Sequence, residues 1–353
     1  MKYVLAIDSF KGCLSSIEAE HALAGEFNKY GIETEGIPMS DGGEGMLEAF
    51  TSALGGTLQP VYIHNHMMRR MDAQYGITAD GTAIIEVAQA CGLTLVKEDE
   101  RNPVRSTTYG VGELLSRAVK RGCRKFIIGL GGTGTSDAGI GMIRALVDIF
   151  ARGKNFDEAM KTELGECHFT LASDVSNPLC GENGAAHVYA PQKGATPEMV
   201  ELLDRRARLF AEKSALHFGF DKSDEPGAGA AGGLGYAFMQ YLGAEMKSGA
   251  DLLLNLVGFD DKIKDADLVI TGEGRADRQT LMGKLPQHIL ERCKQKEIPV
   301  GLIAGQVSDK ASLLTAGFAF ADSITPEGMS LEEAIKKETA LGNLQHWAAS
   351  HSL

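Results

Sequence analysis

The chain has 353 residues, of which 44% are hydrophobic and 23% are charged, and its formal net charge is −12. These values are ordinary for a soluble globular protein, and the length predicts either two domains or one large domain. The negative charge argues against general affinity for nucleic acid or for an anionic membrane surface, because both attract basic proteins. The net charge does not exclude a local basic pocket for a small anion.

Two further features favour a cytoplasmic protein. The N-terminal apolar run stops at Asp8, which makes it too short for the core of a signal peptide. The cysteines form no CxxC pair and no zinc-type spacing, so dispersed reduced thiols are the simplest interpretation. The sequence leaves a homo-oligomer open.

Apolar segments typical of strands alternate with helical patterns along the chain. Ser15 and Glu18 form a capping box at the start of one helix. Thr196 and Pro197 are typical of the N-cap and first position of another helix, which we expect to extend to about Leu216. The expected strands are residues 3–7, 83–87, 125–130, 169–172, 187–190, 267–271 and 299–304. This alternation predicts an α/β architecture with a parallel sheet.

A second capping box, Ser330 with Glu333, predicts a C-terminal helix. We expect its inward face to carry Ile335, Leu341 and Leu344.

The best candidates for domain linkers are residues 64–71 and the loop near Lys284. They predict one domain built from both ends of the chain, residues 1–65 plus 285–353, with residues 66–284 inserted as a central domain.

Polar loops follow five of the apolar segments. In open α/β sheets ligands bind beyond the carboxyl ends of the strands, so these loops are the candidate site. The loop after residues 3–7 carries Asp8, Ser9 and Lys11, and the loop after residues 36–39 carries Asp41. The next two are "GGTGTSDAG", residues 131–139, and "SDVSNPLCGENG", which contains Asp174. The last is "TGEGRADRQTLMGK", residues 271–284, which holds Glu273, Arg275, Asp277, Arg278, Gln279 and Lys284.

Each loop also has a structural interpretation. Asp8 and Asp41 could be helix N-caps, Lys11 could be an ordinary surface lysine, and Asp137 could cap the helix that follows it. The charged stretch 271–284 is the hardest to explain as a turn alone, because turns need glycine and polarity but not this many charges.

The segment "GLGGTG", residues 129–134, matches the dinucleotide fingerprint GxGxxG, with Asp148 about 20 residues further on. That acid should end a second strand, whereas Asp148 lies in a helical pattern, so a nicotinamide site is disfavoured. Glycines and threonine hydroxyls at a helix start suit phosphate equally well. No Walker A motif is present, and His64 and His66 lack partners at metal-ligand spacing.

These residues match the requirements of phosphoryl transfer. Magnesium prefers carboxylate oxygens, phosphate is bound by N–H groups, lysine and arginine, and a hydroxyl nucleophile needs a positioned carboxylate. The residues alone therefore indicate an anion-handling α/β enzyme with several functional acids.

Eight motifs in order resemble the bacterial type I glycerate kinase family. They are "DSFKGCLSSIEAEHAL", "SDGGEGMLEAF", "IIEVAQACGLTLV", "RNPVRSTTYGVGELL", "GLGGTGTSDAGIGM", "SDVSNPLCGENGAAHVYAPQKGAT", "GAGAAGGLGYAF" and "TGEGRADRQTLMGKLP". The resemblance implies ATP- and Mg²⁺-dependent phosphorylation of D-glycerate, usually to 2-phosphoglycerate. It also implies a flavodoxin-like domain made from both chain ends, a central α/β domain, and a site in the cleft between them.

The chain departs from the family pattern at several places. Cys13 replaces a usual serine, Ser40 replaces an alanine, and His288 replaces a glycine. Residues 133–138 read "TGTSDA", and residues 66–76 read "HMMRRMDAQYG" where the family tends to carry glycine and proline. This last segment makes a kinase of another small hydroxy acid the main rival. A nicotinamide oxidoreductase and a non-catalytic metabolite-binding protein are weaker rivals, and a 3-phosphoglycerate product stays open.

The resemblance and the residue chemistry together predict roles. Arg275, Lys11 or Ser9 would hold the glycerate carboxylate, and Arg275 is favoured because a guanidinium binds a carboxylate in bidentate fashion. Asp8 or Asp277 would position the attacking hydroxyl and accept its proton. Asp41, Asp174 and Glu273 are candidates for Mg²⁺, directly or through water. Phosphate or substrate contacts are expected from Gly131, Gly132, Thr133, Thr135, Lys193, Gln279 and Lys284.

Overall fold

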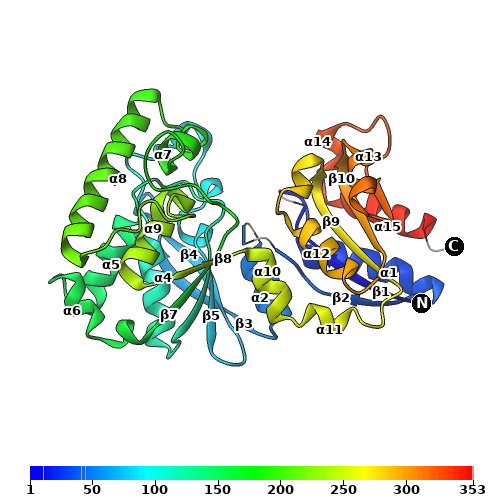
Figure 1. The fold of residues 1–353 in the computed structure, drawn as a ribbon, viewed down its shortest axis with the longest axis horizontal. Helices are drawn as coiled ribbons and strands as arrows, with labels where there is room; N and C mark the ends of the chain where they lie inside the picture. Colours follow the sequence, from blue (N-terminus) through cyan, green and yellow to red (C-terminus); the bar gives the residue numbers. More distant parts are fainter. Residues whose placement is uncertain (11, 41, 44, 352–353) are drawn as a thin grey trace. The chain divides into compact units, whose positions relative to one another are not determined.

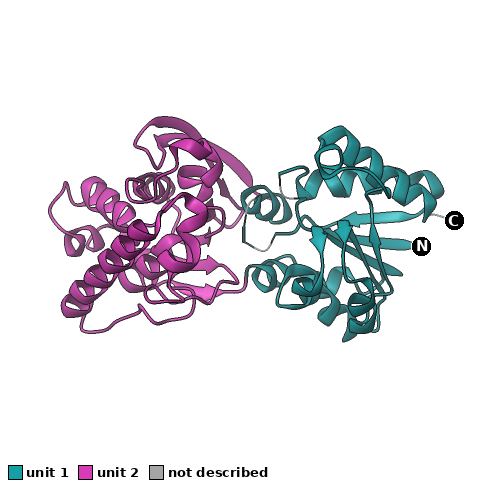
Figure 2. Ribbon diagram, turned by 90° about the horizontal axis from the view of Figure 1, so that it is seen from above, with its two compact units in different colours: residues 1–54, 249–353 teal, residues 55–248 magenta. Residues whose placement is uncertain are grey.

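The structure, a computed structural model, describes residues 1–10, 12–40, 42–43 and 45–351. The chain forms two compact units, shown in Figure 2: unit 1 contains Met1–Leu54 and Gly249–Leu353, and unit 2 contains Gly55–Ser248. The chain therefore changes unit at 54/55 and 248/249, whereas the sequence placed the changes at 65/66 and 284/285. Residues 64–71 contain a hairpin turn and the strand residues on either side of it, inside unit 2, and Lys284 is the N-cap of a helix inside unit 1.

Unit 1 is built on a five-stranded, fully parallel sheet in the order β11-β10-β9-β1-β2 (Figure 1). In chain order this is the flavodoxin arrangement 2-1-3-4-5, which confirms the expected fold class. Its switch point lies between β1 and β9, where ligands bind in such sheets. The strands are β1 (Lys2–Ile7), β2 (Glu33–Gly36), β9 (Leu268–Ala276), β10 (Val300–Val307) and β11 (Phe320–Ser323).

Helix α1 (Ser16–Phe27) and helix α15 (Lys337–Ser350) pack together against this sheet. The predicted Ser15–Glu18 capping box begins α1. Phe27 contacts Trp347 edge to face, with ring centroids 6.3 Å apart. The other helices of unit 1 are α2 (Met46–Ala53), α10 (Gly249–Leu256), α11 (Phe259–Lys262), α12 (Leu285–Lys294), α13 (Lys310–Ala316) and α14 (Leu331–Ala334), with short 3₁₀ helices at Asn28–Tyr30 and Arg278–Leu281.

Glu20, on α1, is a buried acid that forms no ion pair within the described residues. Its side chain is 3% exposed, and its Oε1 atom accepts a hydrogen bond of 3.4 Å from the Ile7 amide. Burial raises the pKa of Glu20 well above 4.5, because the charged form loses its hydration.

Replacing Glu20 by glutamine should therefore stabilise the protein at pH 8. Above pH 4.5 the folded state holds a proton that the unfolded state releases, so wild-type stability falls as pH rises through this range. The glutamine variant does not lose stability in this way. Its free energy of unfolding should exceed that of the wild type by on the order of 1 kcal/mol or more at pH 8, and the difference should shrink toward pH 5. Urea unfolding at both pH values measures it. Glu26→Gln, on the same helix where the carboxylate pairs with Lys29, should bring no stabilisation.

Unit 2 contains a six-stranded mixed sheet in the order β3-β4-β5-β6-β7-β8. Strands β3, β4 and β5 pair antiparallel, and β5 to β8 pair parallel. The strands are β3 (Thr57–His64), β4 (Arg70–Ile77), β5 (Thr82–Glu86), β6 (Lys125–Gly129), β7 (His168–Ala172) and β8 (Glu245–Lys247). Since β5, β6 and β7 run in the same direction side by side, the loops after them meet at one edge of the sheet.

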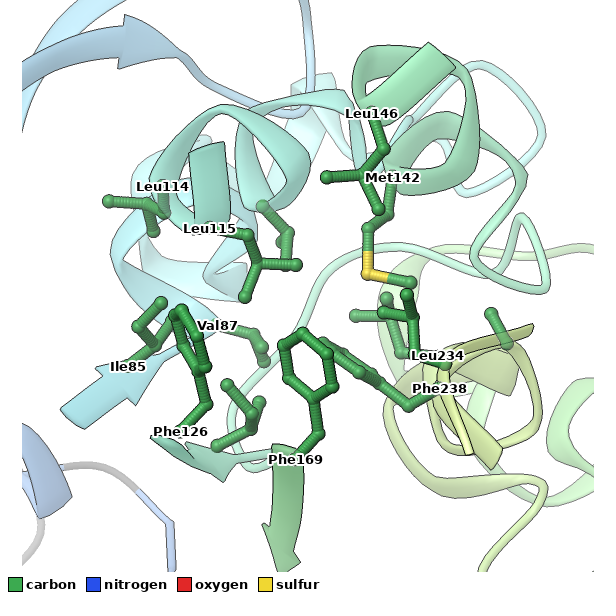
Figure 3. Close-up of a cluster of buried hydrophobic side chains, with 14 of the residues drawn as sticks. Ile85, Val87, Leu114, Leu115, Phe126, Met142, Leu146, Phe169, Leu234 and Phe238 are labelled. Carbon is green, nitrogen blue, oxygen red and sulfur yellow. The ribbon is translucent and has the colours of Figure 1, made fainter. Parts of the chain in front are cut away.

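A large apolar core covers this sheet (Figure 3). Phe126 from β6 stacks on Phe169 from β7 with ring centroids 4.9 Å apart. Leu114, Leu115 and Met142 reach this core from two helices that pack closely on each other. The helices are α3 (Ala88–Cys91), α4 (Tyr109–Lys120), α5 (Ile140–Phe150), α6 (Phe156–Met160), α7 (Ala185–Tyr189), α8 (Pro197–Phe218) and α9 (Ala230–Leu242), with 3₁₀ turns at Leu93–Leu95, Glu98–Glu100, Glu163–Glu166 and Pro191–Lys193. Within the described residues, no helix combines the length and the apolar character needed to cross a bilayer.

Most of the expected elements are confirmed, and two expectations are wrong. Helix α8 begins at Pro197 with Thr196 as its N-cap. The segment 187–190, expected as a strand, lies in and just after helix α7, because Ala186 and Ala190 pack with Val200 in a small separate cluster. A short apolar run does not by itself distinguish a strand from a buried helix.

Ile335 is the second exception. Leu344 is fully buried on α15, as expected, but Ile335 is 48% exposed at the end of α14. Ser330 does cap a helix, yet that helix is only α14, and the chain begins again as α15 at Lys337. Ile335 therefore lies at a helix end and not on the inward face of one long helix.

The turn between β3 and β4 has a strained residue. Asn65 organises this turn, since its Oδ1 atom accepts hydrogen bonds from the amides of Met67 (2.9 Å) and Arg69 (3.0 Å). Met68 has φ of 59°, a left-handed conformation that costs a residue with a side chain roughly 1–2 kcal/mol.

Met68→Gly should therefore stabilise the protein by about 0.5–1 kcal/mol, after allowance for the larger chain entropy of glycine in the unfolded state. Urea unfolding measures the change. Met67→Gly is the control, because Met67 has no positive φ and glycine should destabilise there. A destabilised Met68→Gly variant would show that the turn is not strained.

Candidate functional site

Asp8 stands at the switch point of the unit 1 sheet. It directly follows β1, and its amide donates a hydrogen bond of 2.9 Å to the Gly272 carbonyl of β9. Its carboxylate accepts a 2.8 Å hydrogen bond from the Ser9 amide, and its side chain is 5% exposed. The N-cap of α1 is Ser15, so a capping role does not explain why an aspartate is found at position 8.

Glu273, on the neighbouring strand β9, is held by the loop that follows it. Thr280 Oγ1 donates to one carboxylate oxygen at 2.6 Å, and Lys284 Nζ pairs with the other at 3.0 Å. The Glu273 side chain is buried. Part of the charge in stretch 271–284 therefore fixes the shape of the loop itself, because a buried carboxylate needs partners for both oxygens.

Asp277 also has a structural task. It is the N-cap of the 3₁₀ turn Arg278–Leu281, and its Oδ1 atom accepts a 2.8 Å hydrogen bond from the Gln279 amide. Arg275 lies beside it, with Nε 3.6 Å from Asp277 Oδ2. The side chain of Gln279 is exposed. Of the two acids proposed to position the hydroxyl, this geometry favours Asp8 over Asp277.

A pocket of about 750 Å³ opens at these strand ends within unit 1. Its lining includes the polar side chains of Asp8, Ser9, Glu273, Arg275 and Lys284. These residues come from positions far apart in the chain, yet parallel pairing of β1 with β9 brings them together. Asp277 and Gln279 are not among the lining residues.

Lys193 and the loop after β6 form a second group, in unit 2. Lys193 Nζ donates to the Thr135 carbonyl at 2.7 Å and to Thr133 Oγ1 at 3.2 Å, and its side chain is buried. Burial lowers the pKa of Lys193 to about 8, an effect that the negative potential of Cys91 and Asp137 only partly opposes. A buried ammonium group with glycines 131 and 132 beside it suits a phosphate group.

Asp137 has a structural task, although the N-cap of α5 is Gly139 and not Asp137. Its carboxylate accepts hydrogen bonds from the amides of Thr108 (2.8 Å), Gly139 (3.1 Å) and Gly141 (3.1 Å). It thereby ties the start of α5 to the loop before α4. Asp148 lies inside α5 and not at the end of a strand, so the dinucleotide fingerprint is incomplete.

Of the acids expected to bind Mg²⁺, Asp174 is better suited to direct contact than Glu273. Mg²⁺ is usually bound by one or two carboxylates together with substrate phosphates and water. Asp174 is exposed and follows β7, next to the loop after β6 at the same edge of the sheet. Glu273 already uses both oxygens for Thr280 and Lys284, so it suits a contact through water. Within the described residues, no three His, Cys, Asp or Glu side chains are grouped as a metal site.

Two predicted site residues, Lys11 and Asp41, lie outside the described residues. Eight of the others fall into two groups. The structure places Asp8, Ser9, Glu273, Arg275 and Lys284 together in unit 1, and Thr133, Thr135 and Lys193 together in unit 2.

Sequence reasoning did not select two buried polar residues of unit 2. Glu86 is 4% exposed and ends β5, opposite Gly129 of β6. An acid at the end of the apolar run "AIIE" was the available signal. His66 is 3% exposed, its Nδ1 atom has no hydrogen-bond partner in the part of the chain that the structure describes, and burial lowers its pKa. The sequence carried no sign of its burial.

Known proteins of one family match almost the whole chain. The model of the glycerate kinase family matches residues 3–350. Glycerate kinase from Bacillus subtilis (strain 168) is 38% identical over 95% of this chain and 93% of its own length. Glycerate 2-kinase from Escherichia coli (strain K12) is 38% identical over 89% and 87%. A crystal structure from Salmonella typhimurium LT2, provisionally described as glycerate kinase 2, matches with a TM-score of 0.84 and 35% identity, and covers 100% of this chain and 97% of that one.

Proposed function

Because this chain belongs to the glycerate kinase family, we propose that it transfers the γ-phosphoryl group of ATP to the 2-hydroxyl of D-glycerate, giving 2-phosphoglycerate and ADP. The observation that carries this proposal is the convergence of Asp8, Glu273, Arg275 and Lys284 at the switch point of the unit 1 sheet. An organic acid with a hydroxyl beside its carboxylate needs one cation and one positioned carboxylate, and this pocket supplies both.

Arg275 binds the glycerate carboxylate in this proposal. Its guanidinium lines the pocket and its side chain is 65% exposed, so it is accessible to a ligand. The nearby Asp277 sits 3.6 Å from Nε, which orients the guanidinium without using its terminal nitrogens. Lys284 Nζ forms an ion pair of 3.0 Å with Glu273 Oε2 and adds positive potential to the same pocket.

Asp8 positions the attacking hydroxyl and accepts its proton. The carboxylate is buried beside the pocket and oriented by the Ser9 amide, which keeps the rotamer fixed before substrate arrives. In phosphoryl transfer most of the catalytic effect comes from such alignment and from charge stabilisation, because the transition state is loose.

In unit 2, Lys193 and the backbone of residues 131–135 bind phosphate groups. The threonine contacts of Lys193 fix its ammonium group against this loop. Asp174 would hold Mg²⁺ in unit 2, and the ion would supply positive charge that neutralises the phosphates.

An ADP-release assay tests the proposal. The purified protein is mixed with ATP, Mg²⁺ and one acid at a time: D-glycerate, L-glycerate, or a longer 2-hydroxy acid. We expect ADP release with D-glycerate, little with the other acids, and none after Mg²⁺ is removed with EDTA. Faster turnover of a longer acid would replace the proposed substrate, and the absence of ADP with every acid would remove the proposed function.

A further inference from the structure

The unit 1 pocket is larger and more apolar than a three-carbon acid requires. Asp8 and Arg275 form only a small part of the lining of this pocket, whose volume is about 750 Å³. The segment that follows β11 also lines the pocket, and apart from Thr325 and Glu327 its lining side chains are mostly apolar: Ile324, Pro326, Met329, Leu331 and Ile335. Pockets of this volume usually enclose a ligand the size of a nucleoside or larger.

Two of these apolar side chains are exposed to solvent. Leu331 is 74% exposed and Ile335 is 48% exposed, although both are large and aliphatic. They lie on and just after the short helix α14, at the wall of the same pocket. Apolar groups that surround a concave site, rather than a flat surface, are typical of ligand pockets.

Neutral polar groups line the same pocket. Gln306 and Thr325 are among its lining residues, and their amide and hydroxyl groups can both donate and accept hydrogen bonds. Arg275 and Lys284 also line the pocket, where they complement negative charge. One site thus offers an apolar wall, neutral hydrogen-bonding groups and two cations.

We propose that the apolar end of the unit 1 pocket, between Ile324 and Ile335, binds the purine base of the phosphate donor. The base packs against Ile324, Met329 and Ile335, and the amide of Gln306 or the hydroxyl of Thr325 contacts its edge. The phosphates nearest the base then extend toward Lys284, while Arg275 stays with the glycerate carboxylate. Binding of nucleotides at the switch point of such sheets is the general rule for this architecture. The inference rests on the proposed function in one respect, the use of a purine nucleotide as donor.

Photolabelling locates the base directly. The protein is irradiated with 8-azido-ADP, digested, and the labelled peptide is identified by mass spectrometry. We expect the label between residues 323 and 335, and protection by unlabelled ADP. A label in unit 2, at residues 131–135 or near Lys193, would overturn the inference.

Binding of ADP to two matched variants, measured by calorimetry without turnover, gives an independent test. Ile335→Ser should weaken ADP binding about tenfold and leave the KM for D-glycerate within about twofold, because loss of buried aliphatic surface is worth roughly one factor of ten. Leu314→Ser is the control, since Leu314 is 41% exposed on α13 of the same unit and does not line the pocket.

The outcomes separate the two proposals. Unchanged ADP affinity in Ile335→Ser, with normal phosphorylation of D-glycerate, would refute the base site and leave the proposed function intact. Absence of ADP binding in the wild-type protein would refute both. A larger loss of D-glycerate affinity than of ADP affinity would assign the apolar end to the acid substrate.

Discussion

Asp8→Asn should lower the turnover number for D-glycerate by a factor of about 10²–10⁴, the usual range for loss of a positioned acid–base group. Asparagine has the same shape, and its carbonyl oxygen can still accept the hydrogen bond from the Ser9 amide. The variant should therefore fold normally, bind D-glycerate with a KM within about threefold of wild type, and keep the same Mg²⁺ dependence. Steady-state kinetics at several Mg²⁺ concentrations measures all three.

Asp267→Asn is the matched control for Asp8. Asp267 precedes β9 and accepts a hydrogen bond from the Lys2 amide, at the opposite end of the same two strands. It should retain full turnover. If Asp8→Asn also turns over at nearly the wild-type rate, Asp8 does not take the proton, and Asp277 becomes the acid to test.

Lys193→Met should separate activity from stability. Turnover should fall by a factor of about 10²–10³, as expected for loss of one preorganised group that stabilises the transferring phosphoryl. Stability at pH 7 should stay the same or rise, because burial of the charged ammonium is unfavourable and methionine has a similar volume. The loss of the two Nζ hydrogen bonds to Thr133 and Thr135 offsets part of that gain.

The pH dependence of Lys193 has a definite sign. Its pKa is about 8 in the folded protein and 10.5 in its model state, so between these values the unfolded state binds more protons. Wild-type stability should therefore gain about 3 kcal/mol from this group as pH rises from 8 to 10.5, and Lys193→Met should lack that gain. In the same way, kcat/KM for ATP should fall above pH 8, where free enzyme loses the charge.

The control for Lys193 is Lys213→Met, on the exposed face of α8, which should leave turnover and its pH profile unchanged. An active Lys193→Met variant would contradict the phosphate-binding role. Urea unfolding between pH 7 and 10.5, with variant and wild type in parallel, removes the contribution of all other titrating groups.

Local signals were enough to predict much of the fold. The capping pair Ser15–Glu18 and the pair Thr196–Pro197 place two helix starts correctly, because a cap is an interaction between neighbours in sequence. Strands β1 and β9 could be predicted because they are apolar on both faces. The edge strands β2 and β8 could not, since each is short and polar and is defined only by pairing with a neighbour.

The candidate site was predictable as a set of residues but not as a set of roles. A charged loop after a buried strand identifies Glu273, Arg275 and Lys284. Nothing in the sequence shows that both carboxylate oxygens of Glu273 are bound by Thr280 and Lys284. Ile335 illustrates the same limit. Its helical spacing predicts a core position, and only the coordinates show it at the wall of a pocket.

Phosphorus NMR of the reaction product tests the central claim most directly. The protein is incubated with ATP, Mg²⁺ and D-glycerate, and the new phosphoester signal is recorded without proton decoupling. Transfer to the 2-hydroxyl predicts a doublet, because the phosphorus then couples to the single proton on C2. A triplet from the two protons on C3, or no phosphoester signal beside that of ATP and ADP, would contradict the account.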